Sequence, residues 1–203
     1  MKKYSLLVVS LIVLLIACGP STKLTKTWTD PSVTPQTFKP FNKVLVMARI
    51  QDETGNRIAE DKIAASFKRG NAVPSYMYLH EKDSVPAEVD ARLKRDGFDG
   101  MVTMRLKDID KSVTVSGGGG YGGYGYGYYG GYYGGGFYNP PTVSYNKDYL
   151  VETCIYSLTD GKLLWSGTTS TFNPADLNEM IDGIISSVKN QLVKQGLMSP
   201  PER

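Results

Sequence analysis

Cysteine and histidine, the side chains that most often act as nucleophiles, bases or transition-metal ligands, are scarce in this chain. Its 203 residues include two cysteines, Cys18 and Cys154, and one histidine, His80. His80 lies in a predicted loop, where a lone histidine is more often a surface residue than a general base or a ligand. The three residues are far apart in the sequence and do not have the spacing of a zinc site. The sequence therefore predicts no metal site.

Carboxylates and hydroxyls are numerous, but their spacing does not favour acid–base or nucleophilic catalysis. Glu60 and Asp61 follow Arg57 by three and four residues on a predicted helix. This spacing favours local ion pairs on a solvated face, with a partner-docking face as the alternative. Asp108 and Asp110 alternate along an extended stretch, and no other group is predicted to converge on them for calcium binding or proton transfer. No serine or threonine lies in a nucleophile elbow. We therefore expect a protein that is not an enzyme and that needs no cofactor.

Cys18 has a distinct setting near the N-terminus. Two lysines precede an apolar run over residues 6–16, broken only by a serine, and small Ala17 stands directly before the cysteine. This order predicts a secretory signal with a cleavage site. The run of 11 residues is too short to span a bilayer, which needs about 20. The sequence Leu15-Ile16-Ala17-Cys18 resembles the bacterial lipoprotein signal. That resemblance implies removal of residues 1–17 and a lipid on Cys18, the first residue of the mature chain.

The resemblance also implies an address in the bacterial cell envelope. Gly19 follows Cys18, whereas an aspartate there would indicate retention in the inner membrane. We therefore expect a lipid anchor in the outer membrane and a protein that faces the periplasm. Without Lys2 and Lys3 the formal charge falls from +3 to +1, which gives no electrostatic argument for binding nucleic acid.

Cys154 would be left without a partner for an intramolecular disulfide once Cys18 is lipidated. It lies in a strand-like run, residues 149–158, where a lone cysteine is expected to behave as a small buried hydrophobic residue. A redox role or an intermolecular bridge is the alternative.

Residues 18–42 are predicted to be a flexible tether because they are rich in Ser, Thr, Lys and Pro and show little periodicity. Leu24, Trp28 and Phe38 could dock on the domain. A short edge strand over residues 24–28 would direct Leu24 and Trp28 to the same side. As a flexible chain, the tether would span roughly 25–30 Å on average.

Strands and helices are predicted to alternate at the start of the domain, which covers residues 43–198 and is followed by a short tail, 199–203. Its first strand is an apolar run typical of a strand buried on both faces, as in a parallel sheet. The expected elements are a strand over 44–48, a helix over 57–68 capped by Asn56, a strand over 72–78, a helix over 86–96 and a strand over 99–106. The inner faces of the two helices are expected to carry Ala59, Ile63 and Phe67 on the first, and Val89 and Leu93 on the second.

An antiparallel hairpin and a long amphipathic helix are predicted at the end of the domain. The strand-like runs 149–157 and 163–171 flank Asp160-Gly161, a turn signal because a tight hairpin turn needs positive φ. Asn173 and Pro174 have the residue types that begin a helix, which should run to Gly196. Its apolar stripe should cover the sheet and comprises Leu177, Met180, Ile181, Ile184, Ile185, Val188 and Leu192. We therefore expect an α/β fold, bordering on α+β, with a single mixed sheet in the order β-α-β-α-β-(Gly/Tyr loop)-β-β-α.

A segment of extreme composition separates the third strand from the hairpin. Residues 117–138 are all Gly or Tyr except Phe137 and hold 13 of the 22 glycines and 8 of the 14 tyrosines. Glycine at this density is costly to order, so we expect a mobile loop, with 112–116 leading out and 142–147 leading back. Tyrosine rings and hydroxyls make an interaction loop one hypothesis. A tolerated low-complexity insertion and self-association through stacked rings are the alternatives. The candidate contact residues are Tyr121, Tyr124, Tyr126, Tyr128, Tyr129, Tyr132, Tyr133, Phe137 and Tyr138.

The order of elements resembles that of periplasmic lipoproteins of the curli-secretion and Tol-assembly (TolB N-terminal-like) type. The matching stretches are Lys43-Val44-Leu45-Val46, the helix over 58–67, Gly97-Phe98-Asp99-Gly100, and the turn and strand over 160–165. The chain also looks like outer-membrane lipoproteins with a Gly/Tyr-rich loop at this place. These resemblances imply a non-enzymatic binding or scaffolding module of the cell envelope, anchored to the membrane by its N-terminal lipid. Its partner would be an envelope protein, or peptidoglycan or another glycan. An accessory subunit of a secretion or cell-wall-synthesis complex is the alternative, and the sequence leaves the oligomeric state open.

Overall fold

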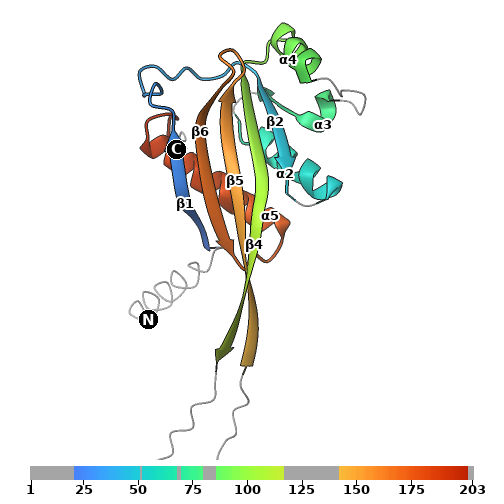
Figure 1. The fold of residues 1–203 in the computed structure, drawn as a ribbon, viewed down its shortest axis with the longest axis vertical. Coiled ribbons are helices and arrows are strands. Elements are labelled where there is room, and N and C mark those ends of the chain that lie inside the picture. The colour runs from blue at the N-terminus through green and yellow to red at the C-terminus, as the bar shows by residue number, and fades with distance from the viewer. Residues whose placement is uncertain (1–20, 51, 68–69, 80–85, 117–141, 201–203) are drawn as a thin grey trace, which may run out of the picture.

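Six strands form one mixed sheet in the order β1-β6-β5-β4-β2-β3 (Figure 1). The computed structural model describes residues 21–50, 52–67, 70–79, 86–116 and 142–200. β2 is parallel to β3 and β4, whereas the β4–β5, β5–β6 and β6–β1 pairs are antiparallel. The strands are β1 (Ser21–Thr29), β2 (Val44–Arg49), β3 (Ala72–Pro74), β4 (Gly100–Ser116), β5 (Thr142–Ser157) and β6 (Lys162–Phe172). The helices are α2 (Glu53–Ala65), α3 (Ser75–Tyr78), α4 (Pro86–Arg95) and α5 (Leu177–Lys194). This arrangement confirms the predicted α/β fold with a single mixed sheet.

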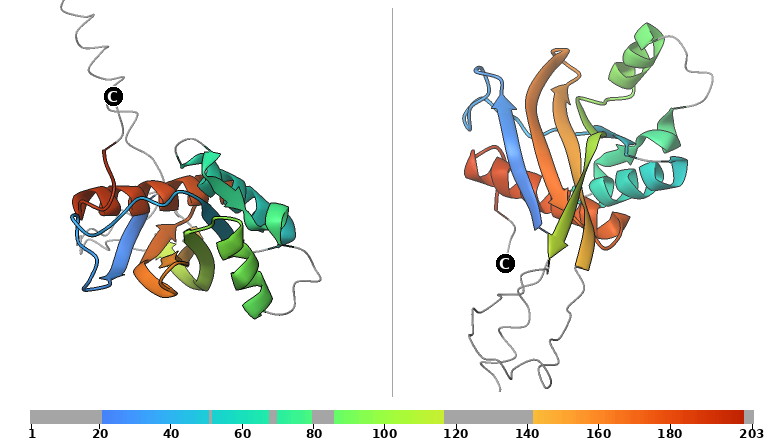
Figure 2. Two further views of the ribbon diagram at one scale, coloured as in Figure 1. Left: turned by 90° about the horizontal axis from the view of Figure 1, so that it is seen from above. Right: turned by 60° about the horizontal axis from the view of Figure 1, so that its bottom comes forward.

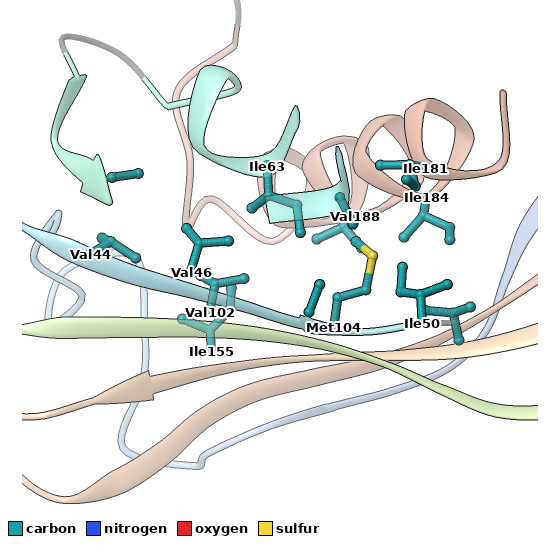
Figure 3. Close-up of a cluster of buried hydrophobic side chains, with 14 of the residues drawn as sticks. Val44, Val46, Ile50, Ile63, Val102, Met104, Ile155, Ile181, Ile184 and Val188 are labelled. Carbon is teal, nitrogen blue, oxygen red and sulfur yellow. The ribbon is translucent and has the colours of Figure 1, made fainter. Parts of the chain in front are cut away.

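Helices α2 and α5 cover one face of the sheet and enclose the main core (Figures 2 and 3). The residues that the two helices bury there are Ala59 and Ile63 from α2, and Met180, Ile181, Ile184, Val188 and Leu192 from α5. Phe67, Leu177 and Ile185 pack partly buried against the same core. The strands supply Val44, Val46, Val102, Met104, Val151 and Ile155. The predicted apolar faces of both helices are therefore confirmed.

Strand β2 is buried on both faces because α4 covers one end of the second face of the sheet. Leu45 points to that face, opposite to Val44 and Val46, and is 1% exposed. It packs in a second cluster with Leu93 of α4. Val89 of α4 lies partly buried against this cluster. The prediction of a strand buried on both faces and the predicted inner face of the second helix are both confirmed.

The edge strand expected over residues 24–28 is confirmed, and it is longer than expected. β1 pairs with β6 from Ser21 to Thr29, so these nine residues belong to the sheet and the tether prediction is wrong for them. It is also wrong for residues 30–42, because Val33, Phe38 and Phe41 pack partly buried against the main core, which confirms the predicted docking of Phe38. A bulge between Leu24 and Lys26 shifts the alternation of side chains. Leu24 therefore packs against the core, while Trp28 turns to the second face and is 46% exposed. The prediction that both residues face the same side is wrong for this reason.

Two helices begin at residues other than those predicted. α2 begins four residues earlier than expected because Asp52 caps it, accepting a hydrogen bond from the Gly55 N–H at 2.7 Å. Asn56 instead lies inside the helix, where its Oδ1 accepts from the Ile50 N–H at 2.7 Å. α5 is capped by Asp176, which accepts from the Glu179 N–H at 2.8 Å. Asn173, the predicted cap, has a φ of +42° and turns the chain out of β6.

The strand predicted over residues 72–78 ends early. β3 stops at Pro74, and the next four residues form the short helix α3. Proline has no N–H to continue the sheet pairing. The Tyr76 N–H, at the start of α3, donates to a carboxylate of α2 instead. The connection from sheet to α3 is therefore set by contacts between elements that local sequence does not show.

Strands β4 and β5 extend beyond the rest of the sheet. The β5–β6 pairing ends at Asp148 and Phe172, but β4 and β5 continue together for six residue pairs, from Lys111–Lys147 to Ser116–Thr142. We call this projecting two-stranded part, Lys111–Ser116 and Thr142–Lys147, the ribbon (Figure 1). The predicted strands leading to and from the Gly/Tyr segment are confirmed. At the other end of β5 the predicted hairpin turn is also confirmed, with Gly161 at a φ of +64°.

Candidate binding surfaces

Several residues singled out from the sequence lie outside the described residues. These are Cys18, His80 and the nine aromatic residues of the Gly/Tyr segment, and the predictions for them stay predictions. Within the described ranges, no helix is both long and apolar enough to cross a membrane. In the same ranges, no three His, Cys, Asp or Glu side chains are grouped to hold a metal ion.

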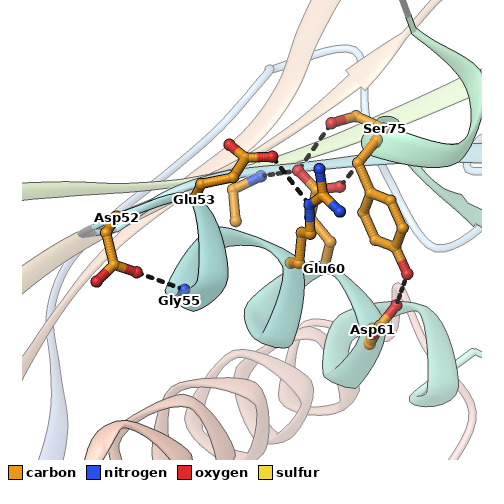
Figure 4. A network of polar contacts seen from close by, with 9 residues as sticks. Asp52, Glu53, Gly55, Glu60, Asp61 and Ser75 are labelled. Carbon is orange, nitrogen blue, oxygen red and sulfur yellow. Dashed lines mark hydrogen bonds and ion pairs between the residues drawn. The ribbon is translucent and has the colours of Figure 1, made fainter.

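Glu60 is a buried structural carboxylate. Its side chain is 3% exposed and joins three elements, α2, β2 and α3 (Figure 4). It accepts hydrogen bonds from the Ala48 N–H at 2.9 Å, the Ser75 hydroxyl at 2.7 Å and the Tyr76 N–H at 3.2 Å. The predicted solvated ion pair with Arg57 is wrong, because α2 turns Glu60 toward the junction of β3 and α3.

Arg57 and Asp61 line the exposed side of the same junction. The Arg57 guanidinium pairs with Glu53 at 2.9 Å and lies 5.1 Å from the centroid of the Tyr76 ring. The Tyr76 hydroxyl donates to Asp61 at 2.8 Å, and this hydrogen bond raises the pKa of Tyr76 above its usual value. With these partners the carboxylates of α2 fasten α3 to the helix layer.

The stretch Gly97-Phe98-Asp99-Gly100 forms a corner that ties the chain before β2 to the start of β4. Gly97 has a φ of +83°, and Phe98 is buried in the second cluster. Asp99 accepts hydrogen bonds from the N–H groups of Asn42 and Lys43 at 2.8 and 3.0 Å. Burial raises the pKa of Asp99, but these hydrogen bonds outweigh burial and leave the pKa below its usual value. A Cβ at Gly100 would lie 2.5 Å from the Phe41 ring, so the position requires glycine.

The second face of the sheet carries two adjoining rows of side chains that α4 does not bury. Strand register places Trp28, Ser166, Cys154, Thr103 and Met47 in one row, and Lys26, Thr168, Glu152, Arg105 and Arg49 in the next. In the second row Glu152 pairs with Arg105 at 2.7 Å and with Lys107 at 3.2 Å. The hydrogen bond from Arg105 lowers the pKa of Glu152 despite its partial burial. The row has an excess of positive charge, because Lys26, Arg105 and Arg49 outnumber its one carboxylate, Glu152.

Cys154 occupies the middle of the first row and is 8% exposed. Its burial raises the pKa of the thiol, which disfavours the reactive thiolate. The expectation of a small buried hydrophobic residue is confirmed. Asp108 and Asp110, the other carboxylates singled out from the sequence, are exposed where β4 approaches the ribbon.

An open groove runs between the edge strand β1 and helix α5, and the sequence did not indicate it. It consists of two adjoining hollows of about 460 and 660 Å³ that share Ser187 and Asn190. One hollow is lined by the basic residues Lys23, Lys26 and Lys194, and the other by the acidic residues Asp176, Glu179 and Asp182. The groove is therefore lined by charged and polar side chains, with a positive end and a negative end. At the negative end Asp182 pairs with Lys62 at 2.8 Å, so the negative charge there rests on Asp176 and Glu179.

Gly183 allows α5 to lie close to β1 and so sets the depth of this groove. A Cβ at Gly183 would lie 2.4 Å from the Thr22 hydroxyl oxygen, which is itself 3.0 Å from the Thr171 hydroxyl. A glycine inside a strongly amphipathic helix was the signal that could have indicated this close approach.

The comparisons with known proteins give distant fold likenesses. No known protein family matches the chain, and no curated protein matches it. The PelC dodecamer from Paraburkholderia phytofirmans is 12% identical over 89% of this chain and 99% of that chain, with a TM-score of 0.43. A variant of the same protein is 11% identical over 83% of this chain and 95% of that chain, also with a TM-score of 0.43. Lipoprotein GNA1162 from Neisseria meningitidis is 12% identical over 75% of this chain and 98% of that chain, with a TM-score of 0.40. These likenesses assign neither a family nor a function, so the resemblance to the curli-secretion and Tol-assembly types stays a prediction.

Proposed function

We propose that this chain is a lipid-anchored lipoprotein of the bacterial envelope, held in the outer membrane and facing the periplasm. The observation that carries the proposal is the sequence Leu15-Ile16-Ala17-Cys18 after an apolar run of signal length. Cleavage before Cys18 would leave two residues between the lipid-bearing cysteine and β1. The signal would thus end just before the folded sheet begins.

The folded part is proposed to act as a non-enzymatic binding or scaffolding module. Support comes from the carboxylates of α2 and the β4 corner, since Glu60, Asp61 and Asp99 all hold structural hydrogen bonds. The groove between β1 and α5 offers a polar binding surface whose two ends carry opposite charge. Its partner would be an envelope protein or a glycan such as peptidoglycan.

One feature favours the alternative of an accessory subunit in a secretion or cell-wall-synthesis complex. β1 lies at the edge of the sheet, and the outer backbone groups of an edge strand can pair with a strand of another protein. The two roles differ in the partner that reaches the groove.

Mass spectrometry of the protein from the bacterial outer membrane tests the anchor. We expect a mature chain that begins at Cys18 and carries acyl groups, and a Cys18→Ser variant that is released from the membrane fraction. Recovery of an unmodified chain that retains residues 1–17 would overturn the anchor.

Photocrosslinking in living cells tests the binding role. A photoreactive residue replaces exposed Asn190 in the groove, and the matched control replaces exposed Thr159 at the far hairpin turn. We expect one specific product from Asn190 and none from Thr159. A glycan product would favour the module, and a stoichiometric protein complex would favour the subunit. Correctly anchored protein that gives no specific product from Asn190 would contradict a binding role for the groove. Repeating the experiment after deletion of residues 117–138 tests the Gly/Tyr segment, because an unchanged set of products would exclude it as the binding element.

A further inference from the structure

We propose that the end of the sheet that carries the ribbon faces the bilayer that holds the lipid, so that the ribbon lies against the membrane surface. The inference rests on the proposed lipidation of Cys18 and adds an orientation to it. It follows from where β1 begins, from the length of chain that precedes β1, and from the side chains at this end.

The first strand begins at the same end of the sheet from which the ribbon projects. Strand register aligns Ser21 with Phe172, Phe172 with Asp148, and Asp148 with Asp110. These four residues form one row across the sheet, and the ribbon starts directly after it. Figure 1 shows the start of β1 and the ribbon at the same end of the molecule. At about 4.8 Å per strand spacing, β1 and β4 are separated by roughly 14 Å across the sheet.

The chain before β1 is short enough to keep this end of the sheet close to the membrane. Cys18 precedes Ser21 by three residues, which reach about 10 Å at full extension. The ribbon continues for six residue pairs beyond the row, or about 20 Å. If the strands stand upright on the bilayer, the ribbon extends past the anchored cysteine. If the sheet leans over, the ribbon lies along the surface. Both arrangements bring the ribbon to the bilayer, whereas a sheet tipped onto its β1 edge would hold the ribbon about 14 Å away, and the side chains at this end favour the first two.

The far end of the sheet is out of reach in an upright arrangement. β6 has 11 residues, from Lys162 beside the hairpin turn at Gly161 to Phe172, which is about 35 Å of strand. The turn is therefore held away from the surface.

The exposed side chains at the ribbon end suit a lipid–water interface. Of the four large hydrophobic side chains that are exposed among the described residues, two are here, Tyr145 at 77% and Phe172 at 43%. Lys111 and Lys147 face each other on the ribbon, two residues along from Tyr145 and on the same face. Tyrosine rings settle at the interface, and lysine chains can extend toward lipid headgroups.

Net charge is not what draws this end to the membrane. Asp110 and Asp148 lie beside the ribbon, and Asp176 begins the nearby helix α5. The end therefore carries both signs of charge. Contact would depend on the lipid anchor and on the aromatic side chains, and it should form on a neutral bilayer.

Fluorescence quenching in vesicles tests the orientation. Mature lipidated protein with Cys154→Ala is reconstituted into phosphatidylcholine vesicles that contain a fraction of brominated lipid. An environment-sensitive dye is attached at Ser112→Cys in the ribbon, which leaves Tyr145 in place, and at Thr159→Cys in the far turn as the matched control. We expect a blue-shifted emission and several-fold stronger quenching by the brominated lipid at residue 112 than at residue 159. The unlipidated Cys18→Ser chain should lose the difference.

Three results would overturn the proposed orientation. The first is equal quenching at the two positions, and the second is stronger quenching at residue 159. The third is a dye at residue 112 that is shielded from water but not quenched by brominated lipid, since a protein contact would then cover the ribbon. Mass spectrometry of the same sample separates these results from a failure of lipidation. A Tyr145→Ser variant in the Ser112→Cys background should weaken the quenching, with circular dichroism as the check on folding.

Discussion

Replacing Glu60 with alanine should destabilise the fold strongly, although glutamate on a helix is usually replaced at little cost. The Glu60 carboxylate receives three hydrogen bonds from β2 and α3 and is 3% exposed. Truncation leaves these donors without their acceptor. The connection between β3, α3 and α2 would loosen as a result.

The magnitude follows from where each donor lies. The Ala48 N–H is buried, and leaving it without an acceptor costs about 1–3 kcal/mol. The Ser75 hydroxyl and the Tyr76 N–H are only partly buried, so water can replace part of what they lose, and together they add about 1 kcal/mol. The higher helix propensity of alanine offsets a few tenths of a kcal/mol of this destabilisation. The net loss is about 2–4 kcal/mol, or roughly 5–12 °C in Tm for a domain of this size.

Urea unfolding followed by circular dichroism measures the effect, with Glu53→Ala as the matched control on the same helix. Glu53 is 71% exposed and pairs with Arg57, so its loss should cost less than about 0.5 kcal/mol. The loss of stability in Glu60→Gln should fall between those of the two alanine variants, because the amide oxygen can keep some of the acceptor contacts. A Glu60→Ala loss no larger than that of Glu53→Ala would show a solvated carboxylate and refute the buried network.

Three further predictions concern close contacts and pH. Gly167→Ala should destabilise by about 1–3 kcal/mol in urea unfolding, because its Cβ would lie 2.4 Å from the buried Trp165 ring; an unchanged midpoint would contradict that packing. Gly183→Ala should gain helix propensity yet still destabilise, since its Cβ would press on Thr22, and hydrogen exchange should then rise first in β1; faster exchange confined to α4 would contradict it. The low pKa of Asp99 means that its ionised form stabilises the fold above the usual carboxyl range, and that this contribution is lost as the pH falls through the folded pKa. The stability difference between wild type and Asp99→Asn should therefore narrow below about pH 4, and a difference that is constant from pH 7 to 3 would count against it.

Periodicity and turn residues were sufficient to predict most of the elements. The stripe of α5, the doubly buried β2 and the Asp160-Gly161 turn each follow from local patterns that the structure confirms. These features depend on interactions within a few residues, so local sequence patterns are enough to predict them.

Helix starts and the surroundings of polar residues were harder to predict because they depend on distant elements. Asp52 and Asn56 are both good capping residues four positions apart. Which of them caps α2 depends on Ile50, the residue after β2, because its N–H donates to the Asn56 side chain. Glu60 has the spacing of a surface ion pair, and its burial appears only when α3 is placed against α2. The groove between β1 and α5 joins residues far apart in the sequence, which no local pattern can show.

The pairing of β1 with β6 has a consequence for the order in which the molecule can fold. Thr22 and its hydrogen-bonding partner Thr171 are 149 residues apart in the chain, and among the described strands β6 is the one that pairs with β1. A chain that crosses a membrane with its N-terminus first would present β1 long before β6 arrives. The first strand, already fixed at the membrane, would have no β6 to pair with until nearly the whole chain had emerged. Such distant pairing is slow to form, so closing the sheet would be a late step, and a chain truncated before β6 would leave its first strand without this partner.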